Sequence, residues 1–281
     1  MRENIKKYIG YMNIGKIRIR YLDTGKGEPL VFLHGLSGRI ETWNRQIPFF
    51  MKRGYRVITL DIPPHGESDK PAIVYSPKYL SRIIAALLEK LNVKRAIVIG
   101  HSMGGILTLA FSMFYPQKVK VAIVLSATPG PARRPRLINV IVMGLLVLRG
   151  MFKHLYAWIE YGSQYRKIVS SPESKYLMYM AYLSHEGILS MPRIPYYGLL
   201  IGLVKENLWR DVKKISSPTA VVMGTRDEFF SFADVLKMAR MNPNIYPIII
   251  KGLGHNIFAI QDLNMKILQL IKRLEKAGFR E

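Results

Sequence analysis

Cysteine is absent from this chain of 281 residues. Its absence excludes disulfide bonds, metal sites built on thiolates and cysteine nucleophiles. The chain also has no pair of histidines four residues apart, so we expect neither a metal site nor a cofactor. Proteins without cysteine are somewhat more typical of reducing compartments, and we therefore predict a cytoplasmic protein.

Long apolar runs are missing as well. The N-terminal segment alternates polar and apolar residues and lacks the continuous apolar stretch of a signal peptide. The longest apolar run covers 12 residues, 137–148, whereas a helix needs about 20 to cross a bilayer. These two absences predict a soluble chain.

Acidic residues are scarce. The chain has 42 basic and 19 acidic residues, a formal net charge of +23. Such an excess is compatible with binding to nucleic acid or to an anionic membrane surface. However, the basic residues form no block of five or more, and no nucleic-acid-binding motif occurs. We therefore predict a generally basic, solvated surface and no nucleic-acid partner.

Short apolar segments alternate with helical patterns along most of the chain. Their Val, Ile and Leu content is typical of strands covered on both faces. The alternation predicts an α/β fold with a mostly parallel, doubly wound sheet. Two segments around "NIGK", at 7–13 and 16–22, alternate with period two and predict a hairpin. The further strands are expected at Leu30–Leu33, Val57–Leu60, Ala96–Ile99, Val121–Leu125, Ala220–Met223 and Ile245–Ile250, and helices near residues 43–53, 76–92, 103–115, 231–241 and 256–277.

One interval, 130–208, breaks this alternation. It has helical patterns and several prolines but no convincing strand. We interpret it as a helical cap inserted into a core domain made of residues 1–129 and 209–281. Within it, residues 137–148 are apolar on all sides and 152–161 are rich in aromatics, which predicts a lipophilic pocket. A second hypothesis is a transient contact of this segment with an anionic membrane surface, since arginines flank it.

The segment "AIVIGHSMGGILTLAF" places a serine between a buried strand and a helix. Gly100-His101-Ser102-Met103-Gly104 matches the pattern G-x-S-x-G in the strand–turn–helix context that this pattern requires. Glycines two positions on either side leave room for a strained turn. We therefore predict that Ser102 is a nucleophile.

A serine hydroxyl needs a base to remove its proton, and the base needs an acid to orient it. Among six histidines, His255 follows a strand and a glycine-rich turn, and we assign it as the base; its alternative role is to cap the helix that follows. Asp227 follows another strand end and is assigned as the acid. Glu228 is adjacent and could partly replace it, whereas Asp234 falls within the following helix, where we expect it on a solvated face.

Two backbone N–H groups are expected to form an oxyanion hole. The N–H of Met103 begins the helix after the nucleophile, where the helix dipole favours negative charge. The loop after Leu30–Leu33 supplies the second donor, which we assign to Leu36. His34 and Gly35 are assigned to this supporting loop, and Gly35 permits a close approach of the backbone.

The segments "LHGLSG…TWNRQIP", "DIPPHGESD", "GHSMGG", "GTRDEFF" and "GLGHNIF" together resemble the α/β-hydrolase superfamily, in the group with one helical cap after the sixth strand. The resemblance covers essentially the whole chain and implies the triad order Ser102, Asp227, His255. The second segment departs from the family pattern, because Pro64 stands where a glycine is usual. We expect Asp61 and His65 in that segment to bond loop backbone.

The resemblance implies a serine esterase or monoacylglycerol-lipase-like enzyme that acts on a small lipophilic ester through an acyl-enzyme. Epoxide hydrolases and haloalkane dehalogenases of the superfamily use aspartate where this chain has Ser102. A carbon–carbon hydrolase of ring-cleavage products is an alternative with the same triad, although an aromatic residue commonly follows the histidine there and Asn256 does so here. An alternative of another class is a non-catalytic binding protein on the same fold. The sequence makes no prediction of the oligomeric state.

Overall fold

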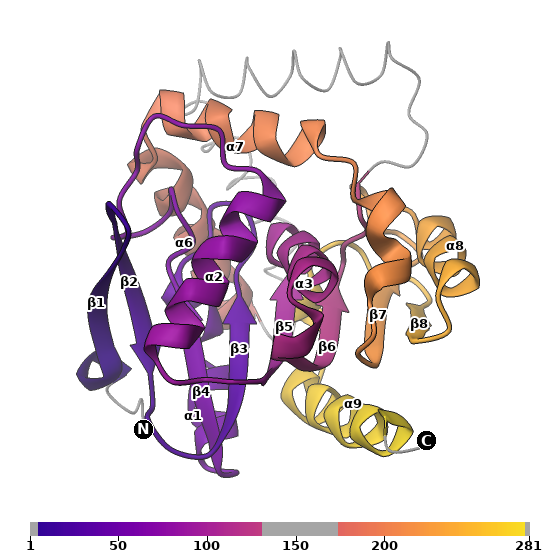
Figure 1. Ribbon diagram of the computed structural model, residues 1–281. Coiled ribbons are helices and arrows are strands. Elements are labelled where there is room, and N and C mark those ends of the chain that lie inside the picture. Colours follow the sequence, from indigo (N-terminus) through magenta and orange to yellow (C-terminus); the bar gives the residue numbers. More distant parts are fainter. Residues whose placement is uncertain (1–4, 131–173, 279–281) are drawn as a thin grey trace.

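The computed structural model describes residues 5–130 and 174–278. Eight strands form one sheet in the order β1-β2-β4-β3-β5-β6-β7-β8 (Figure 1). The strands β1 and β2 form the expected antiparallel hairpin, β2 pairs antiparallel with β4, and all later pairs are parallel. The predicted α/β class with a mostly parallel sheet is confirmed.

The elements match the predicted alternation closely. The strands are β1 (Ile9–Ile14), β2 (Ile17–Asp23), β3 (Glu28–Leu33), β4 (Tyr55–Leu60), β5 (Ala96–His101), β6 (Val119–Leu125), β7 (Thr219–Gly224) and β8 (Ile245–Ile250). The α-helices are α1 (Gln46–Met51), α2 (Pro77–Lys90), α3 (Met103–Phe114), α6 (Ser174–Ser190), α7 (Arg193–Lys205), α8 (Phe232–Met241) and α9 (Leu263–Gly278). Short 3-10 helices cover Ile5–Tyr8, Ile40–Trp43, Pro116–Lys118, Leu208–Lys214 and Ile257–Ala259.

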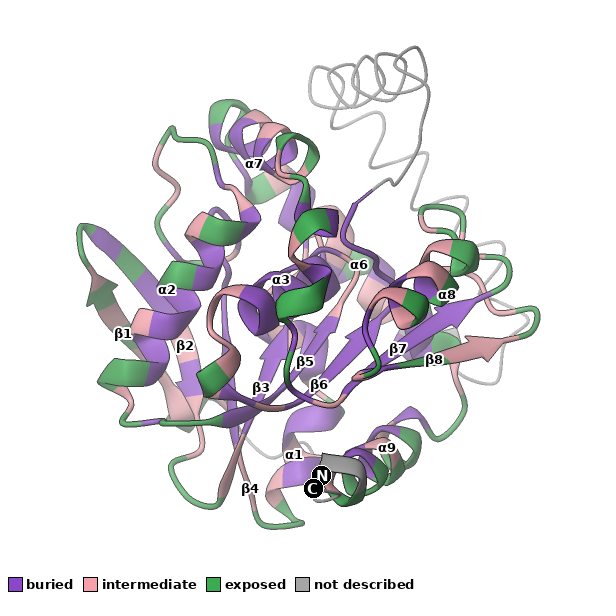
Figure 2. Cartoon of the chain, turned by 45° about the vertical axis from the view of Figure 1, so that its right-hand side comes forward, coloured by how far each residue is buried: buried purple, intermediate pink, exposed green. Residues whose placement is uncertain are grey.

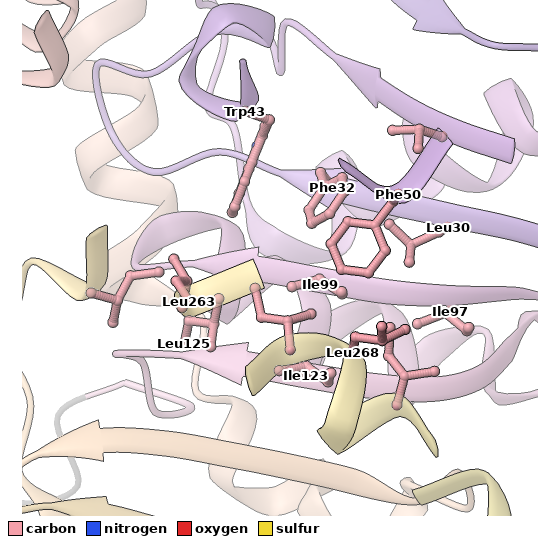
Figure 3. Close-up of a cluster of buried hydrophobic side chains, with 14 of the residues drawn as sticks. Leu30, Phe32, Trp43, Phe50, Ile97, Ile99, Ile123, Leu125, Leu263 and Leu268 are labelled. Carbon is pink, nitrogen blue, oxygen red and sulfur yellow. The ribbon is translucent and has the colours of Figure 1, made fainter. Parts of the chain in front are cut away.

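Successive side chains of the central strands point to opposite faces of the sheet, and each face has its own core. On one face, Leu30 and Phe32 of β3 pack with Trp43 and Phe50 (Figure 3). The rings of Phe32 and Trp43 are stacked with centroids 4.7 Å apart. The helices α1 and α9 cover this face.

The other face is covered by α2, α3 and α8 (Figure 2). Val31 and Leu33 of β3 alternate with the residues named above and pack with Leu107 and Phe111 of α3. A sheet with helices on both faces explains the continuous apolar sequence of the central strands. All six residues of β7 are buried.

Two expectations are corrected at the C-terminal end of the sheet. β8 is an edge strand, so it is not covered on both faces; Tyr246 and Pro247 are exposed in it. The last helix begins at Leu263, not near residue 256. Asn256 caps a short 3-10 helix, and Asp262 has a φ of 55°, so the chain turns before α9 begins.

Between β6 and β7 the structure describes α6 and α7, of which α7 crosses the upper part of Figure 1 and α6 lies below it. The predicted apolar and aromatic segments, 137–148 and 152–161, lie outside the described residues, and the division into core and cap stays a prediction. In the described part of the chain, no single helix has the length and hydropathy to span a membrane. Only α6 and α7 taken together, as Tyr179–Ser190 and Arg193–Lys205, meet the test by length and composition, and they are bent by 109°.

Candidate active site

The predicted site residues meet at one edge of the sheet, because each follows the carboxyl end of a strand. Ser102 directly follows β5 and begins α3. Asp227 follows β7, and His255 follows β8. The loop with Gly35 and Leu36 follows β3, which pairs with β5. Parallel strands end at a common edge, and this is where open α/β sheets bind their ligands.

Ser102 lies on a strained turn between β5 and α3. Its φ is 55° and its ψ is −119°, in the left-handed half of backbone space that costs energy for a residue with a side chain. A Cβ on Gly100 would lie 2.0 Å from the carbonyl oxygen of Gly104, and a Cβ on Gly104 would lie 2.0 Å from that of Leu33. The turn therefore requires glycine at both positions.

Ser102, His255 and Asp227 form a continuous chain of hydrogen bonds. The Oγ of Ser102 lies 2.9 Å from Nε2 of His255. Nδ1 of the same ring lies 3.0 and 3.1 Å from the two carboxylate oxygens of Asp227. A ring whose Nδ1–H donates to a carboxylate leaves Nε2 free to accept a proton from the hydroxyl. The structure thus brings together the three residues that the sequence assigns to a triad.

Asp227 is held as a carboxylate. Burial acts to raise its pKa, but the hydrogen bond and charge of His255 and the N–H groups of Phe229 and Phe230 outweigh burial and lower the pKa below its usual value. Those two N–H groups donate to Oδ1 at 2.9 and 3.0 Å. Four contacts from three donor groups therefore keep the acid ionised and fixed in place.

Aromatic rings and a second carboxylate surround His255. The rings of Phe229 and Phe230 lie 4.7 and 5.8 Å from the imidazole, and that of His101 lies 5.2 Å away. Glu228 accepts a hydrogen bond from the backbone N–H of His255 at 3.1 Å, so it holds the loop and leaves the imidazole to Asp227. Sequence reasoning missed the two phenylalanines as site residues, although they directly follow the acidic pair in "GTRDEFF".

His101 points away from Ser102, as the tight turn requires. Its Nε2 bonds the carbonyl oxygen of His255, 3.1 Å away, so the two loops are joined directly. Burial, together with the neighbouring His255, lowers the pKa of His101 to about 3. The ring is therefore neutral near neutral pH, and Nε2 can donate to that carbonyl.

The contacts of the Gly35 carbonyl oxygen show in which direction the N–H of Leu36 points. The oxygen of Gly35 accepts from Nδ1 of His34 at 2.9 Å and from the N–H of Gly38 at 3.0 Å. Because a trans peptide directs its N–H opposite to its C=O, the N–H of Leu36 points away from both donors. A Cβ on Gly35 would lie 3.3 Å from the Cβ of Ser102, so this peptide lies beside the nucleophile.

The N–H of Met103 is the second predicted donor. Met103 is the first residue of α3, and the first N–H groups of a helix have no acceptor within the helix. The helix dipole adds a positive potential at this end. The N–H groups of Leu36, in the loop after β3, and of Met103, at the start of α3, therefore stay the predicted donors of an oxyanion hole.

A buried ion-pair network supports the loop after β3. Arg20 lies 3.0 Å from Asp61 and 2.7 Å from Glu41. Asp61 also accepts the N–H groups of Ile40 and Glu67, both at 2.8 Å, which confirms its expected role in bonding loop backbone. Arg20 was not singled out in the sequence, since it lies in the hairpin, 41 residues from its carboxylate partner.

Two buried histidines lie behind the same loop. His34 accepts the N–H of Ile62 at Nε2, so its Nδ1 carries the proton that bonds Gly35. His65 bonds the carbonyl of Ile62 through Nδ1, as expected for a structural residue. The peptide between Pro63 and Pro64 in this loop is cis. Burial lowers the pKa of both histidines, and the pKa of His65 lies well below its ordinary value.

No group of three or more metal-ligating side chains occurs within residues 5–130 and 174–278.

Comparison with known proteins gives three kinds of similarity. The family model for the alpha/beta hydrolase fold matches residues 28–261. A 2-hydroxy-6-oxononadienedioate/2-hydroxy-6-oxononatrienedioate hydrolase of Paraburkholderia phymatum is 34% identical over 154 residues, which is 52% of this chain and 52% of that protein. A non-heme chloroperoxidase of Streptomyces lividans is 28% identical over 268 residues, 90% of this chain and 96% of that protein.

The match to the first of these curated relatives thus spans about half of its length. Among solved structures, a carboxylesterase of Nitrososphaera gargenis covers 95% of this chain and all of its own, with a TM-score of 0.78 at 18% identity. At that identity the likeness shows the fold alone.

Proposed function

Since the chain belongs to the alpha/beta hydrolase fold family, we propose that it is a serine hydrolase that cleaves carboxylic esters with a lipophilic acyl or alcohol part. The observation that carries this proposal is the hydrogen-bonded chain from Ser102 through His255 to Asp227, with distances of 2.9 and 3.0 Å. This is the arrangement that makes a serine hydroxyl nucleophilic.

In the proposed reaction, the Oγ of Ser102 attacks the ester carbonyl while His255 takes its proton at Nε2. The N–H groups of Leu36 and Met103 donate to the oxyanion that forms on the carbonyl oxygen. The ester C–O bond then breaks, and His255 returns the proton to the leaving alcohol. A water molecule, deprotonated by the same ring, hydrolyses the acyl-enzyme and releases the acid.

The surroundings of the site favour a lipophilic substrate. Phe229 contacts the imidazole of His255 and yet is 60% exposed, so an apolar ring lies at the site with much of its surface open. On the side of the oxyanion loop, Leu36 packs in a cluster with Met191, Tyr196 and Leu200. An acyl or alkyl chain beside Ser102 would meet the exposed ring of Phe229 and the half-buried side chain of Leu36, which favours its transfer from water.

Cleavage of a carbon–carbon bond in a ring-cleavage product is a second candidate. It is favoured by the Paraburkholderia relative, whose name specifies such a substrate. That name describes a dicarboxylate, whereas the groups identified around His255 and Leu36 in the described residues are aromatic, aliphatic or, in Glu228, negatively charged. For this reason we place the ester first.

A fluorophosphonate probe, a series of nitrophenyl esters of increasing chain length and a 2-hydroxy-6-oxo-dienedioate test the proposal together. We expect the wild type to be labelled and to hydrolyse the longer esters best, and Ser102→Ala to do neither. Turnover of the dienedioate without ester hydrolysis would establish the second candidate instead. Absence of both labelling and turnover would favour a non-catalytic binding protein.

A further inference from the structure

Helix α6 contacts the loop that carries Leu36 through a side-chain hydrogen bond. The Oγ of Ser184 lies 2.7 Å from the Oγ of Ser37, although 147 residues separate the two serines. The hydroxyl of Ser37 donates to the carbonyl oxygen of Leu36. Since that hydroxyl has only one proton, the hydroxyl of Ser184 must be the donor to Ser37. Two linked hydrogen bonds thus lead from α6 to the backbone of Leu36.

The backbone of α6 also packs directly on this loop. A Cβ on Gly187 would lie 1.8 Å from the carbonyl oxygen of Ser37 and 2.7 Å from its carbonyl carbon. Only glycine allows the helix to come this close. Gly187 lies one helical turn from Ser184, so both residues present themselves on the same side of α6.

Ser37 itself needs this support. Its φ is 63°, a left-handed conformation that costs a residue with a side chain free energy and persists only where its surroundings enforce it. The side chain of Leu36 is held as well, because it packs with Met191, Tyr196 and Leu200 at the junction of α6 and α7. The loop is therefore fixed by His34 and Gly38 on one side and by α6 and α7 on the other.

We propose that Ser184 and Gly187 are positioning residues, which hold the Leu36–Ser37 peptide and Ser37 and thereby keep the adjoining N–H of Leu36 in the orientation that it needs to stabilise the oxyanion. This proposal rests on the proposed function, because an oxyanion forms only if Ser102 attacks a carbonyl. Neither residue touches the reacting atoms. They act through Ser37, and a small displacement of the donor is expected to weaken the transition state more than the ground state.

The first test removes the hydroxyl of Ser184. For Ser184→Ala we expect kcat on a nitrophenyl ester to fall by about 10-fold to 100-fold, with KM changed by less than about twofold. Ser184→Thr retains a hydroxyl and is expected to recover most of kcat. Ser190→Ala is the matched control, because Ser190 lies on the same helix and bonds the carbonyl of Gly187 within it.

The second test uses steric conflict at two sites. Gly187→Ala forces the helix and Ser37 apart, and we expect it to lower kcat more than Ser184→Ala does. Gly198→Ala is its control, because a Cβ there would lie 2.0 Å from the carbonyl oxygen of Ile73, away from the oxyanion loop. If both alanine variants lose stability equally and lose kcat equally, the role of Gly187 is merely structural and the proposal is wrong.

Hydrogen–deuterium exchange of residues 34–38 separates this proposal from the proposed function. We expect faster exchange in Ser184→Ala than in Ser190→Ala, whatever the substrate is. If Ser184→Ala exchanges faster but keeps the kcat of an active wild type, the positioning role is wrong. An inactive, unlabelled wild type would instead overturn the proposed function, and unchanged exchange would overturn the contact itself.

Discussion

The Nε2 atom of His255 lies 2.9 Å from the Oγ of Ser102, across 153 residues of sequence. No local structure brings them together: one follows a central strand and the other follows the edge strand β8. The loops are joined a second time, since His101 bonds the carbonyl of His255 at 3.1 Å. Two independent contacts therefore determine where the imidazole lies.

Removal of either member of this pair is expected to abolish most of the activity. Ser102→Ala and His255→Ala should each lower kcat for a nitrophenyl ester by about 10⁴-fold or more, because the hydroxyl and its base act as one unit. The double variant should be no worse than either single variant. Steady-state kinetics checks this, with circular dichroism as the test that the fold is retained. A fall of less than about tenfold in either variant would contradict the triad.

Asp227→Asn should be milder than the loss of the base. The amide still accepts one hydrogen bond, but it no longer favours the tautomer with the proton on Nδ1, and we expect kcat to fall by about 10²-fold to 10⁴-fold. Glu228→Gln is the comparison variant, since its amide oxygen can still accept the backbone N–H of His255. Its kcat should stay within about threefold of the wild type. The opposite ranking of the two variants would move the acid to Glu228.

The turn at Ser102 predicts a large difference between two glycine substitutions. In Gly104→Ala, the new Cβ would lie 2.0 Å from the carbonyl oxygen of Leu33, and we expect the free energy of unfolding to fall by about 3 kcal/mol or more. Gly15 has a φ of 59°, but no atom lies within 4 Å of a Cβ added there. For Gly15→Ala we therefore expect only the conformational cost of a left-handed residue, about 1–2 kcal/mol of the free energy of unfolding. Urea unfolding measures both. Equal losses would mean that close approach is not what requires Gly104.

The buried histidines predict how stability depends on pH. The pKa values of His34, His65 and His101 are lowered from 6.5 in the folded state, chiefly by burial, so below about pH 6.5 the unfolded chain binds protons that the folded chain does not. Stability is therefore expected to fall as the pH falls from about 6.5 to about 5, by up to about 1.4 kcal/mol per pH unit for each histidine.

Urea unfolding at several pH values in this range checks the sign and the slope. His65→Gln removes one of the three groups, and the slope of stability against pH should decrease by the contribution of one proton. The lowered pKa of Asp227 does not enter, because that group titrates near 3.8 in the unfolded chain and lower in the folded chain, below the pH range of this test. A slope that is unchanged in His65→Gln would show that His65 does take up a proton in the folded state.

Much of this fold could be predicted from the sequence, because its signals are local. Continuous Val, Ile and Leu runs predicted the parallel strands, and the helix expected from residue 76 begins at Pro77, with Ser76 as its N-cap. The strand–turn–helix context of Ser102 led to the correct placement of the serine at the end of β5. Asp227 and His255 each follow the end of a predicted parallel strand. Because such strands end at one edge of the sheet, both residues could be placed at the edge where Ser102 lies.

The support of the site could not be predicted in this way. Arg20 meets Asp61 only because β2 pairs with β4, and the sequence around each residue carries no sign of the other. Ser184 and Ser37 are small polar residues in unremarkable surroundings, and their contact depends on how α6 packs. The length of the last helix was overestimated, because Asp262 ends the preceding turn with a positive φ that apolar periodicity does not register.

The two donors on the oxygen of Gly35 have a consequence for the energetics of turnover. In water, solvent dipoles must rotate toward a charge as it develops, and this reorganisation adds to the barrier of every reaction event. Here the N–H of Leu36, in the same peptide as the Gly35 carbonyl, is oriented when the chain folds. The entropic cost of ordering this dipole is therefore met during folding and not in each reaction event. Each later ester carbonyl would meet a dipole that is already aligned.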